Sequence, residues 1–330
     1  NDGYLNAGGN ITIDGARNVI INNNASNNPI QASGSIGIGT DGANPVTGDV
    51  TIENDLNAGT TLTVEADGNI SVNRATLTTG TGSLTLHADK DQSGDVLTIG
   101  STFVTTLDSS TNNQNIILYG DSISIGTGAA TTLDAGSGDI TLHADMNNDG
   151  TGGIRIDEPR VSLTMNDFSI DSTDRPNTLI ISNTPGANTI SANDLASASG
   201  NVNLYARGGG ITVKDQLAIT NSLTIGTTGN VSIEANTSGS SVTVNASGTV
   251  TDTGGVLTST GGNLTITGSG IGSSANYLDV SVSGGNLILT TTDATGSGDI
   301  YITSGANLSL GAINTAAGVV DTVDIRTTSG

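Results

Sequence analysis

Two copies of one short string carry the residues of this chain that are best suited to bind an ion. Leu84-Thr-Leu-His-Ala-Asp89 is followed, 56 residues later, by Ile140-Thr-Leu-His-Ala-Asp145. Both strings lead into acidic, amide or hydroxyl oxygens at alternate positions: Asp89, Asp91, Ser93 and Asp95 in the first copy, and Asp145, Asn147, Asp149 and Thr151 in the second. Oxygens at positions 1, 3 and 5 with Gly at position 6 form the first half of an EF-hand loop, so the pattern indicates calcium.

The second half of that motif is missing from both copies. Position 12 should supply a bidentate carboxylate, but Gly100 and Ile156 stand there, and only the second copy has an acid just beyond, Asp157. The alternative interpretation is a polar loop expelled from the fold and rich in turn-forming residues. Both interpretations stay open. Calcium would stiffen a loop, and we predict that no cofactor is required.

Catalytic chemistry is a weaker interpretation of the charged residues. His87 and His143 occupy equivalent places in the repeated string, which is typical of inherited positions. Arg155, Asp157, Glu158 and Arg160 gather around one proline, a pattern that favours surface ion pairs. The other basic residues are scattered. We therefore predict no enzymatic activity and keep a carbohydrate-active β-helix enzyme as the third hypothesis.

The composition predicts a thin hydrophobic core. The 330 residues include 47 glycines, two phenylalanines, five tyrosines, no tryptophan and no cysteine. Small aliphatic side chains must therefore fill the interior, because the large residues that usually do so are nearly absent.

The net charge excludes two classes of partner. The formal charge is -22, with nine Lys and Arg against 31 Asp and Glu. Nucleic acids and anionic membrane surfaces both need a cationic face, so we predict neither as a partner. No apolar run approaches the roughly 18 residues of a membrane span, so we predict no membrane insertion. The chain has no signal-like start, and we expect it to be a segment of a longer protein.

Short strands recur along the chain. Each begins with Gly or a small polar residue, continues with Asn, Asp or Ser, and then has two aliphatic residues separated by one residue, usually small and polar. Examples are Gly9–Ile13, Gly48–Ile52, Gly138–Leu142, Gly200–Leu204 and Gly262–Ile266. This alternation is typical of half-buried β-strands that follow a turn.

The spacing of these strands predicts a solenoid. Aliphatic residues recur about every 20 positions in one column: Val202, Leu223, Val242, Leu264, Leu287 and Leu308. A second column keeps pace: Ile211, Val231, Val250 and Ile271. The first column extends backwards, on a less regular spacing, through Leu179, Val161, Ile140, Ile116, Val96, Ile70, Val50, Ile30 and Ile11.

We predict an all-β fold, a right-handed parallel β-helix with about 20 to 22 residues per coil and roughly fifteen coils. It forms a single continuous segment over 1–330, with loop excursions near 89–95, 108–115 and 145–153. Inward positions form aliphatic ladders, and outward positions carry Thr, Ser and Asn. An array of antiparallel β-sandwiches is less favoured, because neither a repeat near 100 residues nor a buried aromatic is visible.

The C-terminal third resembles the repeat region of filamentous haemagglutinin-like exoproteins, large bacterial adhesins exported by two-partner secretion. The matching strings are Gly248–Gly255, Gly261–Thr267, Gly270–Asp279 and Gly296–Ile313, and similar Gly-Asp-Ile-x-Leu units run through the chain. The family's secretion domain carries an Asn-Pro-Asn motif, but Asn28-Pro29 is followed here by Ile30. The resemblance therefore implies export for the parent chain only.

The resemblance implies a structural shaft segment of an extracellular bacterial adhesin or filament, secreted or at the cell surface, that mediates attachment or cell-cell contact. The expected partners are flanking repeats of the same chain or other copies of it. The alternative is a module that binds host or surface glycans or proteins through outer loops, for which Tyr4, Tyr119, Tyr205, Tyr277 and Tyr301 could supply aromatic platforms.

Overall fold

The structure is a computed structural model of the whole chain, and its strands form a parallel β-solenoid. It describes residues 5–22, 28–145, 152–156, 161–165, 167–170, 178–181, 189–190, 200–206, 210–213, 216–293, 298–316 and 321–328. The chain divides into two compact units, Asn1–Asn177 and Thr178–Gly330.

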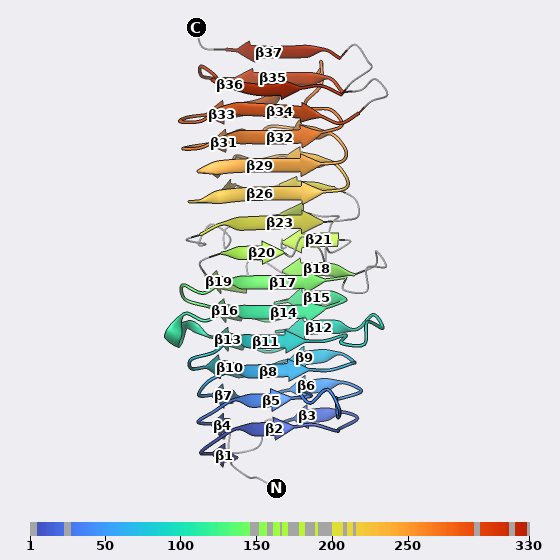
Figure 1. Cartoon of the computed structure of the whole chain (residues 1–330), viewed down its shortest axis with the longest axis vertical. Coiled ribbons are helices and arrows are strands. Elements are labelled where there is room, and N and C mark those ends of the chain that lie inside the picture. Colours follow the sequence, from blue (N-terminus) through green and yellow to red (C-terminus); the bar gives the residue numbers. More distant parts are fainter. Residues whose placement is uncertain are drawn as a thin grey trace. The chain divides into compact units, whose positions relative to one another are not determined.

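Each turn of the first unit contributes one strand to each of three parallel sheets (Figure 1). The first sheet contains β1 (Asn6–Ala7), β4 (Ile30–Ala32), β7 (Leu56–Ala58), β10 (Thr76–Thr79), β13 (Thr105–Asp108), β16 (Thr131–Asp134) and β19 (Val161–Thr164). The second contains β2 (Ile11–Ile13), β5 (Ile36–Ile38), β8 (Leu62–Glu65), β11 (Leu84–His87), β14 (Ile116–Gly120), β17 (Ile140–Ala144) and β20 (Phe168–Ile170). The third contains β3 (Val19–Ile21), β6 (Val50–Ile52), β9 (Ile70–Val72), β12 (Val96–Ile99), β15 (Ser122–Ile125) and β18 (Gly153–Ile156).

The second unit also has three parallel sheets, but from β32 (Leu264–Gly268) on its strands alternate between two of them. One of its sheets contains β23 (Val202–Ala206), β26 (Ser222–Thr227), β29 (Ser241–Ala246), β32 (Leu264–Gly268), β34 (Leu287–Thr291) and β36 (Leu310–Asn314). Another contains β21 (Thr178–Ile181), β22 (Thr189–Ile190), β24 (Ile211–Val213), β27 (Val231–Ile233) and β30 (Val250–Asp252). The third contains β25 (Leu217–Ala218), β28 (Thr237–Gly239), β31 (Leu257–Ser259), β33 (Leu278–Val282), β35 (Ile300–Ser304) and β37 (Val323–Thr327).

Stacked aliphatic side chains make the core of each unit. In the first unit Leu62, Leu84, Ile116 and Ile140 pair in register on successive strands, and all four are completely buried. The residues between the inward positions face outward and are half-exposed, as the pattern of β8 and β11 shows. Alternate residues of a strand point to opposite faces, so one row fills the interior while the other meets water.

Both predicted columns of the second unit are confirmed, with one exception. Val202, Leu223, Val242, Leu264 and Leu287 pair in register, as do Ile211, Val231, Val250 and Ile271. Leu308 was the wrong choice, because Leu310 pairs with Leu287 and the register shifts between β34 and β36. Leucines at 308 and 310 both fit an alternating pattern, so the local sequence could not separate them.

The backward extension of the first column was wrong. Ile116 and Ile140 do share a sheet, but Val50 and Ile70 lie in the third sheet of the unit, and Val161 lies in the first. Val96 is one residue out of register, because Leu97 pairs with Ile70. A constant period fails here because the turns differ in length.

The turns are longer and fewer than predicted. The solenoid has about 11 turns of about 24 residues instead of roughly fifteen turns of 20 to 22. The paired residues Leu84 and Ile116 lie 32 positions apart, since this turn contains two long connections. One of them, residues 109–115, includes the short 3-10 helix η1 (Ser110–Asn112), and the other is 88–95.

The ladder makes a direct prediction about stability. Leu86 is completely buried and pairs with Val64 and Leu118 in the two adjacent turns. We expect Leu86→Ala to lower the free energy of unfolding by about 2 to 5 kcal/mol, because it leaves a cavity between turns. Urea denaturation followed by circular dichroism measures the loss. The control Thr85→Ala faces outward and should cost under about 1 kcal/mol; equal losses for the two variants would contradict an inward ladder at 86.

Candidate functional site

The two copies of the repeated string lie in one sheet, on strands β11 and β17, with β14 between them. Their outward histidines therefore flank Tyr119, with which His87 and His143 pair in register. The ring centroids are 4.7 Å apart for His87 and Tyr119 and 4.3 Å apart for Tyr119 and His143. All three side chains are half-buried, so the repeated histidines form part of an aromatic ladder on the outer face.

Each copy ends in an aspartate that turns the chain out of the sheet. Asp89 and Asp145 have φ of 60° and 57°, in the left-handed region that Asp and Asn adopt more readily than most residues. Both are completely buried. The backbone N–H of each aspartate donates a hydrogen bond to the preceding turn. Asp89 donates to the carbonyl of Gly68, and Asp145 donates to that of Asp121. The shared string is thus the sequence of a repeated corner.

The loop after Asp89 brings three of its predicted ligands together. Carboxylate oxygens of Asp89, Asp91 and Asp95 lie within 4.8 Å of one another. The Gly94 N–H donates to Asp89 Oδ1 at 2.8 Å, and the Ser93 N–H donates to Asp91 Oδ1 at 3.2 Å. Ser93, the fourth predicted ligand, instead donates its hydroxyl to Asp95 Oδ2 at 2.7 Å.

The structure explains why position 12 of the EF-hand pattern, Gly100, cannot serve as a ligand of this loop. Gly100 follows β12, whose four residues carry the chain about 13 Å away from Asp95 at about 3.3 Å per residue. The described loop is therefore a short acidic turn between two strands. Its geometry differs from a helix-flanked EF-hand loop.

The second predicted loop lies mostly outside the described residues. Asp145 is described, whereas Asn147, Asp149, Thr151 and Asp157 are not, and neither are Glu158 and Arg160. The predicted calcium ligands of this copy stay a prediction.

The acidic loop has little positive charge of its own. Lys90 is its one basic residue, and Lys90 Nζ forms an ion pair with Glu65. Two like charges about 4 Å apart repel by about 1 kcal/mol in water and by about 4 kcal/mol at an effective dielectric constant of 20. The hydrogen bonds from Ser93 and Gly94 offset part of that repulsion.

Another buried carboxylate lies in the second unit. Asp252 at the end of β30 is 3% exposed and accepts a hydrogen bond from the Asp279 N–H at 2.6 Å. Burial raises the pKa of Asp252 above its usual value, and the charge of Asp279 adds to the increase. The charged form of this residue is therefore disfavoured in the folded protein.

An aromatic and charged cluster forms on the second unit. Tyr277 and Tyr301 pack edge to face with centroids 5.5 Å apart, and the Arg326 guanidinium lies 4.4 Å from the Tyr277 centroid. The Tyr277 hydroxyl and Arg326 both donate to Asp324. The bond from Arg326 has the larger effect and, together with the bond from Tyr277, lowers the pKa of Asp324. The hydrogen bond to Asp324 raises the pKa of Tyr277. Sequence reasoning named the tyrosines but did not predict this cluster, in which the Tyr277 hydroxyl bonds Asp324, 47 positions further along the chain.

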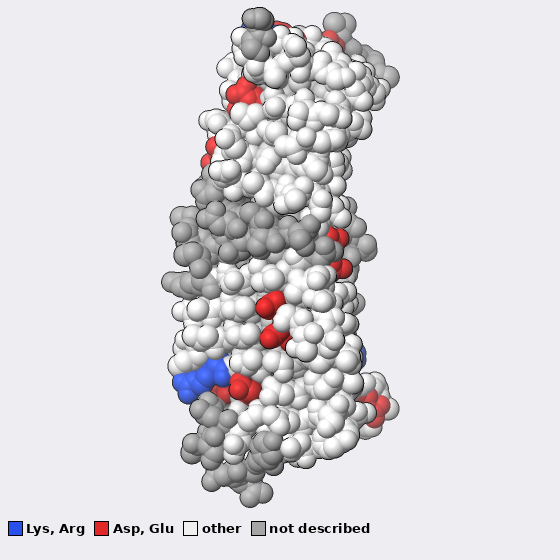
Figure 2. Space-filling view, turned by 90° about the vertical axis from the view of Figure 1, so that its left-hand side faces the viewer, with Lys and Arg blue, Asp and Glu red and all other residues white. Residues whose placement is uncertain are grey.

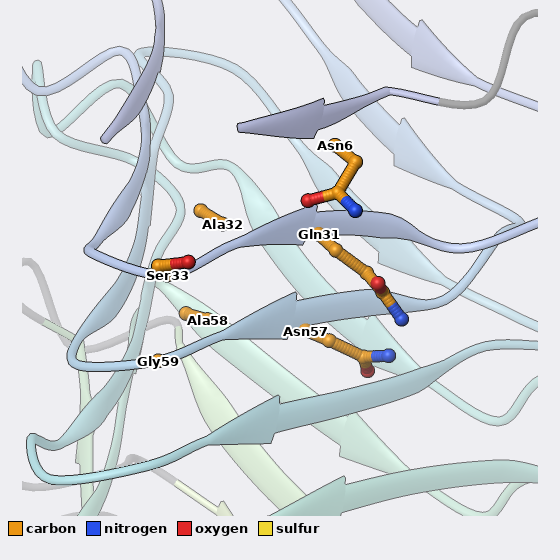
Figure 3. A pocket seen from close by; sticks show the side chains of 7 residues that line it. All are labelled: Asn6, Gln31, Ala32, Ser33, Asn57, Ala58 and Gly59. Atoms are coloured by element: carbon orange, nitrogen blue, oxygen red, sulfur yellow. The ribbon is translucent and has the colours of Figure 1, made fainter. Parts of the chain in front are cut away.

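An open groove lies on the outer face of the first sheet of unit one (Figure 3). The amides of Asn6, Gln31 and Asn57 project into it from the successive strands β1, β4 and β7. Ala32, Ser33, Ala58 and Gly59 line the rest. None of these residues is charged, so the groove is the surface of an amide ladder.

Charged side chains are sparse on the face that Figure 2 shows. Most described residues there are uncharged, and Asp and Glu lie in small separate groups. Some outward columns consist instead of small polar residues, for example Thr224, Thr243 and Thr265 in register on β26, β29 and β32.

Comparisons with protein-family models, with curated proteins and with solved structures give no match. Within the described residues, no helix has the length and apolar character needed to span a bilayer. The fold class is therefore established by the structure itself, a parallel β-solenoid.

The raised pKa of Asp252 predicts how the free energy of unfolding depends on pH. The folded pKa of Asp252 lies above the unfolded value of about 3.9, so its contribution to stability is present below that pH and is lost as the pH rises through the folded pKa. We expect the stability difference between the wild type and Asp252→Asn to decline from pH 3 toward pH 7. Urea denaturation at several pH values measures it.

Asp41 supplies the matched control. Hydrogen bonds from the Asn44 side chain and the Ala43 N–H lower its pKa, so its contribution is present above about pH 3.9 and is lost as the pH falls. The wild type minus Asp41→Asn difference should therefore rise with pH. A decline for both variants would show that burial does not govern Asp252.

Proposed function

We propose that this chain is a structural shaft segment of a large extracellular bacterial adhesin or filament. In this proposal it is secreted or displayed at the cell surface, holds binding regions away from the cell and mediates attachment or cell-cell contact. The resemblance of residues 248–313 to filamentous haemagglutinin-like repeats supports the family and the location.

The observation that carries the proposal is the unshifted register of the stacked turns over long stretches of each unit. Five successive strands pair without a shift from Val202 through Leu287, and each backbone ladder repeats the same inward and outward rows. A solenoid of this kind is held by contacts between neighbouring turns, so stiffness is spread along its length. A surface of stacked threonines supports a passive role better than a catalytic one.

Partners and cofactors follow from the same proposal. β36 carries Leu310, which is 49% exposed although it continues the ladder from Leu287. Edge strands with exposed apolar residues pair readily, so flanking repeats of the chain or another copy would cover this edge. We propose no catalytic activity, no required cofactor, no nucleic-acid partner and no membrane insertion. Right-handed winding is proposed because parallel crossovers nearly always take that hand.

Electron microscopy of the full-length secreted protein tests the proposal. A shaft should image as a thin, unbranched fibre, and protease added to intact producing cells should remove it from their surface. A compact particle, or protection inside the cell, would contradict the shaft and its location respectively.

The Tyr277 and Tyr301 pair favours a second candidate, a glycan- or protein-binding module. Tyrosine rings offer apolar faces for sugar stacking, and Arg326 already covers Tyr277, which leaves Tyr301 as the platform. On immobilised glycans we expect Tyr301→Ala to weaken binding at least about tenfold, the effect of losing roughly 1.4 kcal/mol. Tyr119→Ala, in the other unit, is the control. If both variants bind like the wild type, Tyr301 is not the platform.

A further inference from the structure

The corner loop at 88–95 is anchored at both ends by the turns beside it. The Asp89 N–H donates to the Gly68 carbonyl on one side, and the Asp121 N–H donates to the Asp95 carbonyl on the other. In the next turn a single residue, Asp121, joins β14 to β15 where this turn uses eight. The loop is therefore an insertion at a corner. The backbone hydrogen bonds to the neighbouring turns fix the positions of Asp89 and Asp95 at its two ends.

Within this loop, the Asp89 side chain has a buried oxygen that no described residue satisfies. Its side chain is completely buried, and its Oδ1 accepts the Gly94 N–H. Its Oδ2 is also buried and has no hydrogen-bond partner among the described residues. A buried carboxylate oxygen without a partner is costly, so a missing partner is expected there.

The neighbours of Asp89 indicate what that partner is. Asp91 is exposed and Asp95 half-exposed, and each has a carboxylate oxygen within 4.8 Å of a carboxylate oxygen of Asp89. Three carboxylate oxygens this close together repel one another and attract a cation. The nearby ammonium group, Lys90, is held by Glu65.

We propose that Asp89, Asp91 and Asp95 bind one calcium ion that closes this corner of the solenoid. The donors are hard oxygens, which suit Ca²⁺ and Mg²⁺ over softer metals. Ca²⁺ accepts irregular sets of six to eight oxygens, including backbone carbonyls and water, whereas Mg²⁺ needs a near-octahedral arrangement. An irregular surface loop of this kind matches Ca²⁺. The ion would supply the partner that Asp89 Oδ2 lacks and relieve the repulsion.

The inference is independent of the adhesin proposal, because it depends only on the geometry of one corner. Its consequence is mechanical: Asp91 at the tip of the loop becomes tied to Asp89 and Asp95 at its base. The inserted loop then gains order that its own hydrogen bonds supply only in part.

Equilibrium dialysis of the chelator-treated chain against calcium chloride tests the site. We expect Asp91→Asn and Asp95→Asn each to weaken binding at one site at least about tenfold, or to remove one ion per chain. Asp41→Asn is the matched control, an acid in another exposed turn that contacts Asn44, and it should bind like the wild type. In dialysis against magnesium chloride, Mg²⁺ should bind at least about tenfold more weakly than Ca²⁺. Circular dichroism confirms that the variants keep their strands.

Three outcomes overturn the proposal. These are no calcium bound by the wild type, unchanged binding by both loop variants, or tighter magnesium binding. Counting the ion lost on substitution separates this loop from any calcium bound elsewhere in the chain.

Tryptic cleavage at Lys90–Asp91 tests the mechanical consequence. Calcium should slow it at least several-fold relative to cleavage at the exposed Arg17–Asn18 bond, an internal control for calcium effects on the protease. The slowing should disappear in Asp95→Asn. An unchanged ratio in the wild type would show that the ion does not order the loop.

Discussion

The structure of each unit depends on one constraint: every inward side chain must pack on its counterpart in the next turn. The strands of neighbouring turns lie about 4.8 Å apart, so a side chain can vary little in size from turn to turn. Val, Ile and Leu meet this demand. At close corners only glycine does, because a Cβ at Gly80 would lie 2.1 Å from the Gly59 carbonyl oxygen. The shortage of aromatic residues and the abundance of glycine have this common cause.

The same constraint limits where function can arise. Inward positions and tight corners are committed to packing, which leaves outward columns and inserted corner loops. The outward columns hold ladders such as His87, Tyr119 and His143, whose rings stack because their strands are in register. The loop at 88–95 is an inserted corner loop, and such insertions are tolerated because lengthening a surface loop costs little free energy.

The shaft and the calcium loop are compatible roles for such a scaffold. A shaft needs turns that resist separation, and the ladders within each unit provide that resistance without any single indispensable contact. A cation bound at a corner adds order only where the chain leaves the ladder. The strongly acidic composition favours such an ion electrostatically, because a chain of net charge -22 concentrates counterions around it.

Local pattern by itself determined the strands, the parallel stacking and the corner acids. Alternation places Leu84 and Leu86 inward whatever the neighbouring turn contains, and turns of nearly constant length kept the columns from Val202 to Leu287 in register. Only the tertiary structure decided which residues of 5–170 share a column, because inserted corners of variable length uncouple sequence distance from position along the stack. It also decided the burial of Asp89 and the meeting of Tyr277 with Tyr301. Both depend on which residues of neighbouring turns lie side by side. Where an inserted corner interrupts the repeat, the sequence period no longer predicts those neighbours.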